Sequence, residues 1–514
     1  MNKSIKKYYL FITLFVTGAA VMVLELIGTR VIAPTYGSGL FVWASLITVA
    51  LTCLSIGYWL GGKYADKKSD FKNLYIIILI VGLSIAPIPK LSKFVLMLGT
   101  DLDFRIGALL SAYILFTIPL ILLGMVSPYA IKLATSELKV LGSTAGKLYA
   151  VSTSGSFVGT LLTGFILIPN IGTEKILYLQ SLILILLWVI YQLINKKYIA
   201  GLVSLCIFCL PIIFLYGFSL KNKESNIKLV YKTESIYGQI KVFDEGDERK
   251  IYFDNIRQSS INLNTYLCTA TPYYSFESVH LFNPNGKNAL LIGLAGANIP
   301  RRLWEYGINT DCVDIEQKME YVARKYFGFL DCFGKIYIKD GRVYVKKTDK
   351  KYDFVVIDVF TGEDIPFHLL TKEGFQDVKK ILNENGIVAI NYLGEAYGND
   401  SIGWKSVNKT LENVFNNVRV FSLAKSAGLK DKVSNIIFFA SDNQLIYPKD
   451  FEKQVKGKIA QYIIDLYSKC ELETDSNEGI VLMDNYCPIE FIRKNVAQRV
   501  RQKQIQSESQ RYFF

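Results

Sequence analysis

The chain divides into two parts according to the spacing of its apolar positions. Up to about residue 220 the apolar runs are long and nearly uninterrupted. A transmembrane helix needs roughly 20 such residues, and seven stretches reach this length: 8–33, 41–61, 74–97, 106–131, 147–169, 175–194 and 198–219. Farther on, the apolar runs shorten to strand length and alternate with helix-like stretches. We therefore predict a multi-span α-helical membrane domain followed by an α/β domain.

The first apolar stretch is a span rather than a signal peptide. It contains Glu25 and Arg30, lacks a small-residue cleavage site and leads directly into a second span. Two interpretations of these charges remain open, a proton or substrate relay and a buried ion pair or snorkelling arginine that fixes helix packing. We favour the second. The loop at 61–68, with Gly61, Gly62 and Asp66, also resembles a loop of major-facilitator transporters.

The soluble part begins with a β-hairpin pattern. Apolar residues alternate over 234–243, an acidic turn follows at 244–247, and a second alternating run covers 250–253. Strands are then predicted at 289–293, 310–314, 335–339, 353–358, 386–391, 417–422 and 434–440. We predict a seven-stranded, mostly parallel Rossmann-like sheet of the methyltransferase type. The expected divisions are 1–220 for the membrane domain, 221–288 for the linker and hairpin region, 289–445 for the sheet, and 446–514 for a helical extension with a basic tail.

A glycine-rich turn and carboxylates follow successive strands of this sheet. Gly293 and Gly296 lie in the first turn, and Asp314 and Glu316 follow the second strand. The Asp340-Gly341 pair follows the third strand and Asp358 ends the fourth. Open α/β sheets bind nucleosides at these strand ends. We expect Asp314 to accept from ribose hydroxyls, Asp340 from an adenine amino group, and Asp358 to hold a proton or orient an amine.

Charge and topology lead to a conflict about the membrane domain. Basic residues lie in four segments: before the first apolar stretch, between the second and third stretches, between the fourth and fifth, and between the sixth and seventh. The excess of positive charge places these four segments in the cytoplasm. Seven crossings would then leave the α/β domain outside, away from a cytosolic nucleoside. Either one segment does not cross, or the domain is not an intracellular catalyst. The segment 74–97, interrupted by Pro87, Pro89 and Lys90, is the first candidate, and 198–219 is the second. We expect a multi-pass cell-membrane protein with its catalytic domain in the cytoplasm.

Composition narrows the chemistry further. The formal net charge is +13 and mean hydropathy is +0.26. On a membrane protein this charge indicates cytoplasmic loops, so no nucleic-acid partner is expected. Two histidines and eight scattered cysteines leave little material for a zinc site, and no metal is expected. We interpret the thiols as reduced. His280 is expected to be a packing residue, whereas for His368 a place in the lining of the site and a packing role both remain open.

The soluble part resembles spermidine synthase, in the version fused to a membrane domain. The motifs that carry the resemblance are Tyr237-Gly238-Gln239-Ile240, Asp254 to Gln258 with Asn255 in place of a glycine, Gly293 to Gly296, Asp314 with Glu316, Asp340-Gly341, Asp358, Ile365 to Thr371, and Asp484-Asn485-Tyr486-Cys487-Pro488. It covers about residues 230–445 and continues into the N-terminal spans at Glu25 to Arg30 and Gly57 to Asp66.

The resemblance implies an activity. The family transfers an aminopropyl group from decarboxylated S-adenosylmethionine to an amine and releases methylthioadenosine, with the donor as a substrate and no prosthetic group. By resemblance, Asp358 would accept the proton, with Tyr237 and Gln258 positioning the amine. The donor would contact Gly293, Gly296, Asp314, Glu316, Asp340 and Gly341. The expected partners are an amine, the lipid membrane and a second copy of the chain in a homodimer.

Departures from the family pattern keep other functions open. The family's glycine-rich loop carries an aspartate, but this chain has Leu294-Ala295-Gly296-Ala297 there. The family's Tyr-His-Glu segment, which binds the acceptor, is replaced by residues Pro272 to Phe276. The second acid of the catalytic loop is displaced to Glu363-Asp364. A site with fewer acidic side chains is expected to bind a diamine, which carries two positive charges, less tightly. The alternatives are an S-adenosylmethionine-dependent methyltransferase or aminocarboxypropyl transferase, and a non-catalytic polyamine transport or sensing protein. Arg301 and Arg302 would favour an intact donor if they faced the glycine turn.

Overall fold

The structure is a computed structural model, and it describes two compact units. The described residues are 3–37, 39–99, 102–135, 141–197, 226–235, 237–269, 274–360, 365–422, 425, 433–446, 460–475 and 478–504. The first unit comprises residues 1–225 with 233–239 and the last two residues, and the second comprises 226–232 and 240–512. The predicted span at 198–219 lies outside the described residues.

The first unit is helical, as expected. Its elements are α1 (Lys3–Tyr36), α2 (Leu40–Lys67), α3 (Phe71–Ile85), α4 (Ile88–Leu98), α5 (Phe104–Ala134), α6 (Leu141–Leu161), the π-helix η3 (Leu162–Leu167), α7 (Ile168–Ile171) and α8 (Thr173–Ile194). Within the described part, five helices are long and apolar enough to cross a membrane, or six if the bent pair α3–α4 is one span. This pair bends by 56° next to Pro87, at the interruption noted in the sequence.

Small residues let α1 and α6 approach closely. A Cβ on Gly155 would lie 1.9 Å from the carbonyl oxygen of Phe15, and one on Gly18 would lie 2.2 Å from that of Ser152. The Ser156 hydroxyl donates to the Gly18 carbonyl at 3.0 Å. Helices in membranes commonly pack through such small residues, because van der Waals contact rather than water exclusion drives their association.

A four-stranded antiparallel sheet follows, in the order β1-β2-β3-β4. Its strands are β1 (Ile227–Glu234), β2 (Gln239–Glu245), β3 (Glu248–Phe253) and β4 (Ile256–Asn262). The predicted hairpin is the β2–β3 pair, in which Ile240 faces Phe253. Asp254 and Asn255 turn the chain into β4 with φ of 45° and 65°. Asparagine tolerates this left-handed conformation, which explains how it can stand where the family pattern has glycine.

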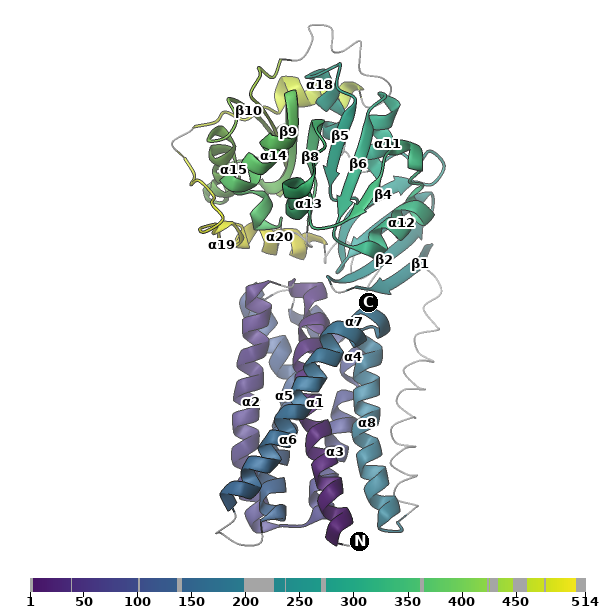
Figure 1. Cartoon of the computed structure of the whole chain (residues 1–514), viewed down its shortest axis with the longest axis vertical. Helices are drawn as coiled ribbons and strands as arrows, with labels where there is room; N and C mark the ends of the chain where they lie inside the picture. Colours follow the sequence, from purple (N-terminus) through teal and green to yellow (C-terminus); the bar gives the residue numbers. More distant parts are fainter. Residues whose placement is uncertain are drawn as a thin grey trace. The chain divides into compact units, whose positions relative to one another are not determined.

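The larger sheet has seven strands in the order β10-β11-β9-β8-β5-β6-β7 (Figure 1). They are β5 (Asn288–Ile292), β6 (Asn309–Asp314), β7 (Ile336–Ile338), β8 (Tyr352–Ile357), β9 (Leu382–Glu395), β10 (Asn417–Ser422) and β11 (Val433–Ser441). The pairs from β9 to β7 are parallel, and β11 is antiparallel to both β9 and β10. The mostly parallel seven-stranded prediction is therefore confirmed.

Helices cover both faces of this sheet. The helices that flank it are α11 (Asn298–Glu305), α12 (Gln317–Phe327), α13 (Gly341–Lys347), α14 (Lys372–Ile381), α15 (Ile402–Glu412), α18 (Ala460–Lys469), α19 (Ile489–Ile492) and α20 (Lys494–Gln504). One core joins α13, α14 and α15 to the face that carries Val355 and Phe438. On the opposite face, Tyr467 of α18 packs edge-on against Phe421 of β10. The strand order reverses between β5 and β8, and ligands of open α/β sheets bind at such a point.

Candidate active site

The glycine turn after β5 lies against the end of β8. Gly293 has φ of 98°, and a Cβ there would lie 2.2 Å from the Asp358 carbonyl oxygen. The Asp358 amide donates to the Ile292 carbonyl at 2.9 Å, which fixes this contact. Only glycine adopts such a conformation at low cost while leaving room for the neighbouring strand. Ala297 ends the turn at φ 54° and precedes α11.

Asp314 holds the same turn from the end of β6. Its Oδ2 accepts from the Leu294 amide at 2.9 Å and its Oδ1 from the Glu316 amide at 2.8 Å. Burial raises the pKa of Asp314 to about 6, against the lowering effect of these two donors. The Glu316 side chain instead caps α12, accepting from the Lys318 amide at 2.8 Å. The Glu316 side chain is thus engaged at the start of α12, and its contact with the donor stays a prediction.

Asp340 lies at the N-terminus of α13. Its Oδ1 accepts from the Val343 amide at 2.9 Å, and its Oδ2 lies 3.4 Å from Nε2 of His368. Both side chains are about one-third exposed, so the carboxylate is partly open. A Cβ on Gly341 would lie 2.5 Å from Cγ2 of Ile292, so this glycine allows α13 to approach the end of β5. The structure thus brings His368 to the predicted adenine side.

Asp358 follows β8 and is held by two asparagines that the sequence analysis missed. Asn391 Nδ2 donates to Asp358 Oδ1 at 2.8 Å, and Asn435 Nδ2 donates to Asn391 Oδ1, also at 2.8 Å. Burial raises the pKa of Asp358 to about 6, although the hydrogen bond from Asn391 acts to lower it. A carboxylate with this pKa is ionised near neutral pH and still basic enough to accept a proton. The position of Asn391, a polar residue inside the otherwise apolar run 386–391, was the feature of the sequence that could have indicated its role.

Strand β4 lies beside the glycine turn. Asn298 Nδ2 donates to the Ser259 hydroxyl at 2.5 Å, and a Cβ on Gly296 would lie 2.6 Å from the same oxygen. Gln258, the neighbour of Ser259, is the extra residue at a β-bulge, because Ile251 pairs with Ser259 whereas Tyr252 pairs with Arg257. Bulges change the direction of side chains and occur often next to active sites.

The remaining predicted residues belong to the first unit, to the packing around the large sheet, or to the part of the chain outside the described residues. Tyr237 lies in the first unit, in the turn between β1 and β2, where its amide donates to the Ser235 hydroxyl at 3.0 Å. The displaced acids at 363–364 and residues 272–273 lie outside the described residues. His280 stacks on Tyr306 at 3.9 Å between ring centroids, in agreement with a packing role.

Two arginines just past the glycine turn are engaged elsewhere. Arg302 forms an ion pair with the buried Glu277 at 2.5 Å. Arg301 donates to the Gly328 carbonyl at 2.6 Å, and its guanidinium lies over the ring of Tyr266. Both guanidinium groups therefore have structural partners. Neither arginine supplies the basic group near the glycine turn that would favour intact S-adenosylmethionine as the donor.

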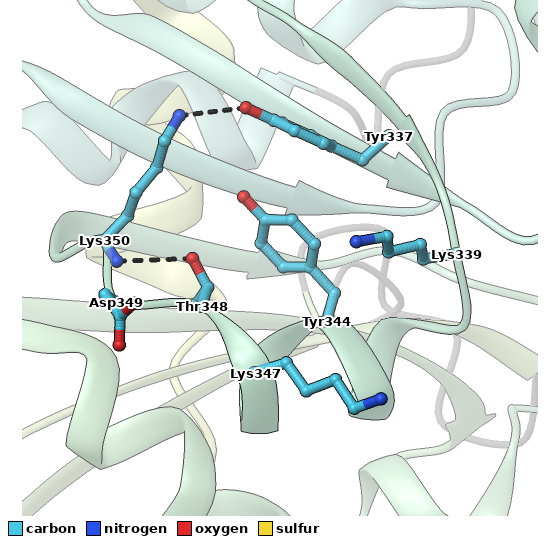
Figure 2. Close-up of a pocket in the computed structure, with 7 residues that line it drawn as sticks. All are labelled: Tyr337, Lys339, Tyr344, Lys347, Thr348, Asp349 and Lys350. Carbon is cyan, nitrogen blue, oxygen red and sulfur yellow. Dashed lines mark hydrogen bonds between the residues drawn. The ribbon is translucent and has the colours of Figure 1, made fainter.

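A hollow of about 450 Å³ lies beside α13, and Figure 2 shows the residues around it. The described residues that line it are Tyr337, Lys339, Tyr344, Lys347, Thr348, Asp349 and Lys350. Lys350 Nζ donates to the Tyr337 hydroxyl at 3.0 Å and to Asp311 Oδ2 at 2.6 Å. None of the site residues predicted from the sequence is among these lining residues, so the hollow is a separate feature of α13.

The second unit is similar in sequence to known proteins. Residues 276–443 match the family model of the spermine/spermidine synthase domain. A polyamine aminopropyltransferase of Vibrio vulnificus is 26% identical over 280 residues, which are 52% of this chain and 91% of that protein. The chain contains a spermidine synthase-like domain.

Other relatives of the synthase-like domain include a second kind of transferase. A probable polyamine aminopropyl transferase of Bifidobacterium longum is 29% identical and covers 44% of this chain and 50% of its own. An N-terminal histidine N-methyltransferase of Emericella nidulans is 30% identical over 31% of this chain and 29% of its own. Among solved structures, a probable spermidine synthase of Corynebacterium glutamicum has a TM-score of 0.41 at 17% identity, covering 52% of this chain and 94% of its own.

Proposed function

We propose that the chain is an aminopropyltransferase that uses decarboxylated S-adenosylmethionine and an amine. The observation that carries the proposal is the Asp358 carboxylate, which lies beside the glycine turn and has its pKa raised to about 6 by burial. The matching synthase domain and the aminopropyltransferase relatives support the same reaction.

The reaction requires little of the protein beyond alignment and proton transfer. The amine nitrogen attacks the propyl carbon next to the sulfonium, the carbon–sulfur bond breaks, and methylthioadenosine leaves with the electron pair. Asp358 orients the amine and takes its proton as the new carbon–nitrogen bond forms. Asn391 keeps the carboxylate oriented through its 2.8 Å hydrogen bond.

The donor is assigned to the surrounding strand ends. Asp314 would accept from the ribose hydroxyls and Asp340 from the adenine amino group, while Gly293, Gly296 and Gly341 leave room for the backbone to approach. Gln258, at the β4 bulge, and Tyr237 are proposed to position the amine, on the strength of their motifs. The apolar helices support anchoring in the cell membrane. The distribution of basic residues between them favours a catalytic domain on the cytoplasmic side, and the resemblance to spermidine synthase favours a homodimer.

A second candidate is methyl transfer from intact S-adenosylmethionine, which the N-terminal histidine N-methyltransferase relative favours. The engagement of Arg301 and Arg302 argues against it, because neither is placed to bind the extra carboxylate of the intact donor.

Product analysis separates the two candidates. The detergent-purified chain would be incubated with each donor and a panel of monoamines, diamines and polyamines. Methylthioadenosine that appears only with the decarboxylated donor and a particular amine is the expected result and identifies the acceptor. S-adenosylhomocysteine from the intact donor would instead establish the methyltransferase, and binding without either product would favour a sensing role.

A further inference from the structure

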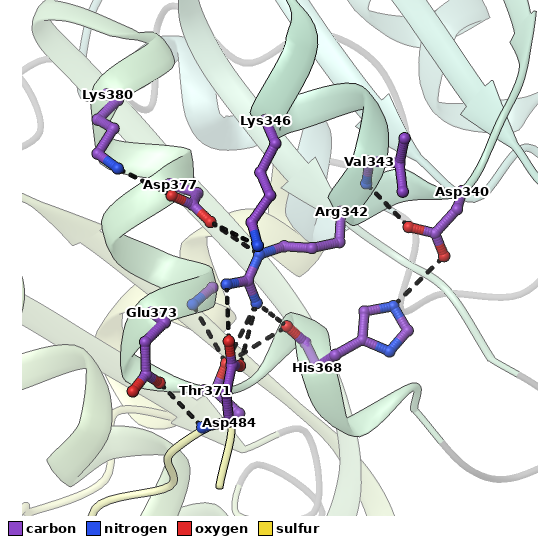
Figure 3. Close-up of polar contacts among 11 residues, drawn as sticks. Asp340, Arg342, Val343, Lys346, His368, Thr371, Glu373, Asp377, Lys380 and Asp484 are labelled. Atoms are coloured by element: carbon purple, nitrogen blue, oxygen red, sulfur yellow. Dashed lines mark hydrogen bonds and ion pairs between the residues drawn. The ribbon is translucent and has the colours of Figure 1, made fainter.

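A buried arginine next to the Asp340-Gly341 pair connects three distant segments of the chain. Arg342 lies on α13 with its side chain only 7% exposed. Its Nε donates to Asp377 Oδ2 on α14 at 2.9 Å, and its Nη2 to Asp484 Oδ2 at 3.2 Å. Its Nη1 donates to the His368 carbonyl. Figure 3 shows the guanidinium at the centre of these contacts.

Asp484 completes this cluster from the C-terminal extension. Its Oδ1 accepts from the Thr371 hydroxyl at 2.6 Å, and its amide donates to Glu373 Oε2 at 3.0 Å. The Lys372 amide donates to the Leu482 carbonyl at 2.8 Å, so the backbone of the extension is joined to the same place. Burial acts to raise the pKa of Asp484, but Thr371 and Arg342 outweigh it and hold the pKa below its usual range. Asp484 is therefore an anion wherever the enzyme is expected to work.

The segment held in this way is the far end of the loop that begins at Asp358. Thr371 caps α14 through the Gly374 amide at 3.2 Å, and three residues earlier His368 reaches Asp340 at 3.4 Å. A Cβ on Gly374 would lie 2.8 Å from the His368 carbonyl and 2.9 Å from Arg342 Nη1, so the packing here is close. The near end of the loop is fixed separately, by the Asp358 hydrogen bonds to Ile292 and Asn391.

We propose that Asp484 and Arg342 are positioning residues for the donor site, which hold the 366–371 segment so that His368 lies against Asp340 at the adenine end. Neither residue touches the reacting atoms. The C-terminal extension thereby forms a working part of the donor site, whereas the base at Asp358 keeps its own support from Asn391 and Asn435. The role assigned to Asp484 rests on the proposed transfer reaction.

The test compares Asp484→Asn, Asp484→Ala and Arg342→Lys in the full-length chain. The matched control is Glu478→Gln, which removes an ion pair of the same extension, with Lys405. Hydrogen bonds to charged groups are strong enough that losing those to Asp484 should raise the donor KM and the Kd for methylthioadenosine about tenfold in Asp484→Ala. The backbone amides of residues 366–371 should exchange their hydrogens faster. The apparent pKa in the pH profile of the rate should not change, because Asp358 sets it. Asp484→Asn and Arg342→Lys, which keep part of the cluster, should show smaller changes in the same direction.

The outcomes are distinguishable. A lower kcat with unchanged donor KM and unchanged exchange at 366–371 would mean that Asp484 only supports folding, which overturns the positioning role. Equal behaviour of Asp484→Asn and Glu478→Gln in both measurements would overturn it as well, even if Asp484→Ala fails to fold. If the wild-type chain itself neither binds methylthioadenosine nor releases it, the proposed function fails instead.

Discussion

The two units of this chain bury polar chemistry in different ways. In the helical unit, buried hydroxyls such as those of Thr13 and Thr17 donate to carbonyls one turn earlier in their own helix, and helices meet through glycines. In the α/β unit, ionisable groups are buried at strand ends, and burial raises the pKa of Asp314 and Asp358 to about 6. Strongly shifted carboxylates in a crevice are typical of active sites. The contrast places the expected acid–base chemistry of Asp358 in the second unit.

The strongest test of this contrast is to remove the proposed base. Asp358→Asn should lower kcat by about 10²–10⁴-fold, the usual contribution of general acid–base catalysis. Binding of methylthioadenosine should persist, because Asp314 and Asp340, the carboxylates proposed for the ribose and the adenine, are untouched. Steady-state kinetics and calorimetry measure the two effects. Unchanged turnover would remove Asp358 from the mechanism and bring the binding-module function forward.

The same substitution in both units sharpens the comparison. Gly293→Ala forces a side chain to φ 98° and within 2.2 Å of a carbonyl that the sheet holds in place, so donor binding should be lost. Gly155→Ala also meets a carbonyl, at 1.9 Å, but α1 and α6 can separate slightly. We expect it to lower the thermal stability of the helical unit without changing kcat. Gly62→Ala, which meets nothing within 4 Å, is the control. A drop in kcat with Gly155→Ala would break the division between the units.

Asp358 should also weaken the fold at neutral pH. Its folded pKa of about 6 lies above the unfolded value, so the folded state binds more protons and loses stability as pH rises through 6. Asp358→Asn has no such loss. At pH 7.5 the Asp358→Asn variant should be more stable than the wild type by about 2–3 kcal/mol, because each unit of pKa shift corresponds to about 1.4 kcal/mol. Below pH 4 the difference in stability should vanish. Denaturant unfolding at the two pH values measures it, and equal stabilities at pH 7.5 would contradict the raised pKa.

The smallest expected effect concerns the asparagine behind the base. Asn391 donates to the ionised form of Asp358 and so lowers its pKa. Asn391→Ala should therefore move the acidic limb of the kcat/KM profile to higher pH, because the charged form loses a donor. Asn383→Ala is a suitable control, since the side-chain amide of Asn383 donates a hydrogen bond to Asp353, a surface residue. A shift to lower pH, or an equal shift in the control, would contradict the assignment.

Much of this architecture could be predicted because it depends on periodicity. The apolar runs marked the six helical stretches that fall within the described residues, and each predicted strand of the large sheet overlaps one in the structure. The hairpin prediction was incomplete, since β1 and β4 extend it to four strands. Fold class and transferase family were accessible from local patterns.

The details of the site depend on contacts between distant positions. Asn391 and Asn435 are 44 residues apart and meet only because β11 lies beside β9. The partner of Arg342 at Asp484 is 142 residues away, and nothing in the local sequence indicates the pairing. The capping role of Glu316 was equally hidden, because the same residue type can face a ribose or cap a helix.

The place of β11 in the sheet also determines when the enzyme can first work. A ribosome makes the strand that ends near Asp358 well before it makes Asn435, and at usual elongation speeds the interval is on the order of ten seconds. During that interval Asp358, the proposed base, lacks the full chain of side-chain amides that orients it, since β11 must enter between β10 and β9. A nascent chain that stops short of residue 433 would carry the glycine turn and the strand-end carboxylates Asp314, Asp340 and Asp358, and yet lack the asparagine that completes the support of the proposed base. Competence is thus acquired late in synthesis.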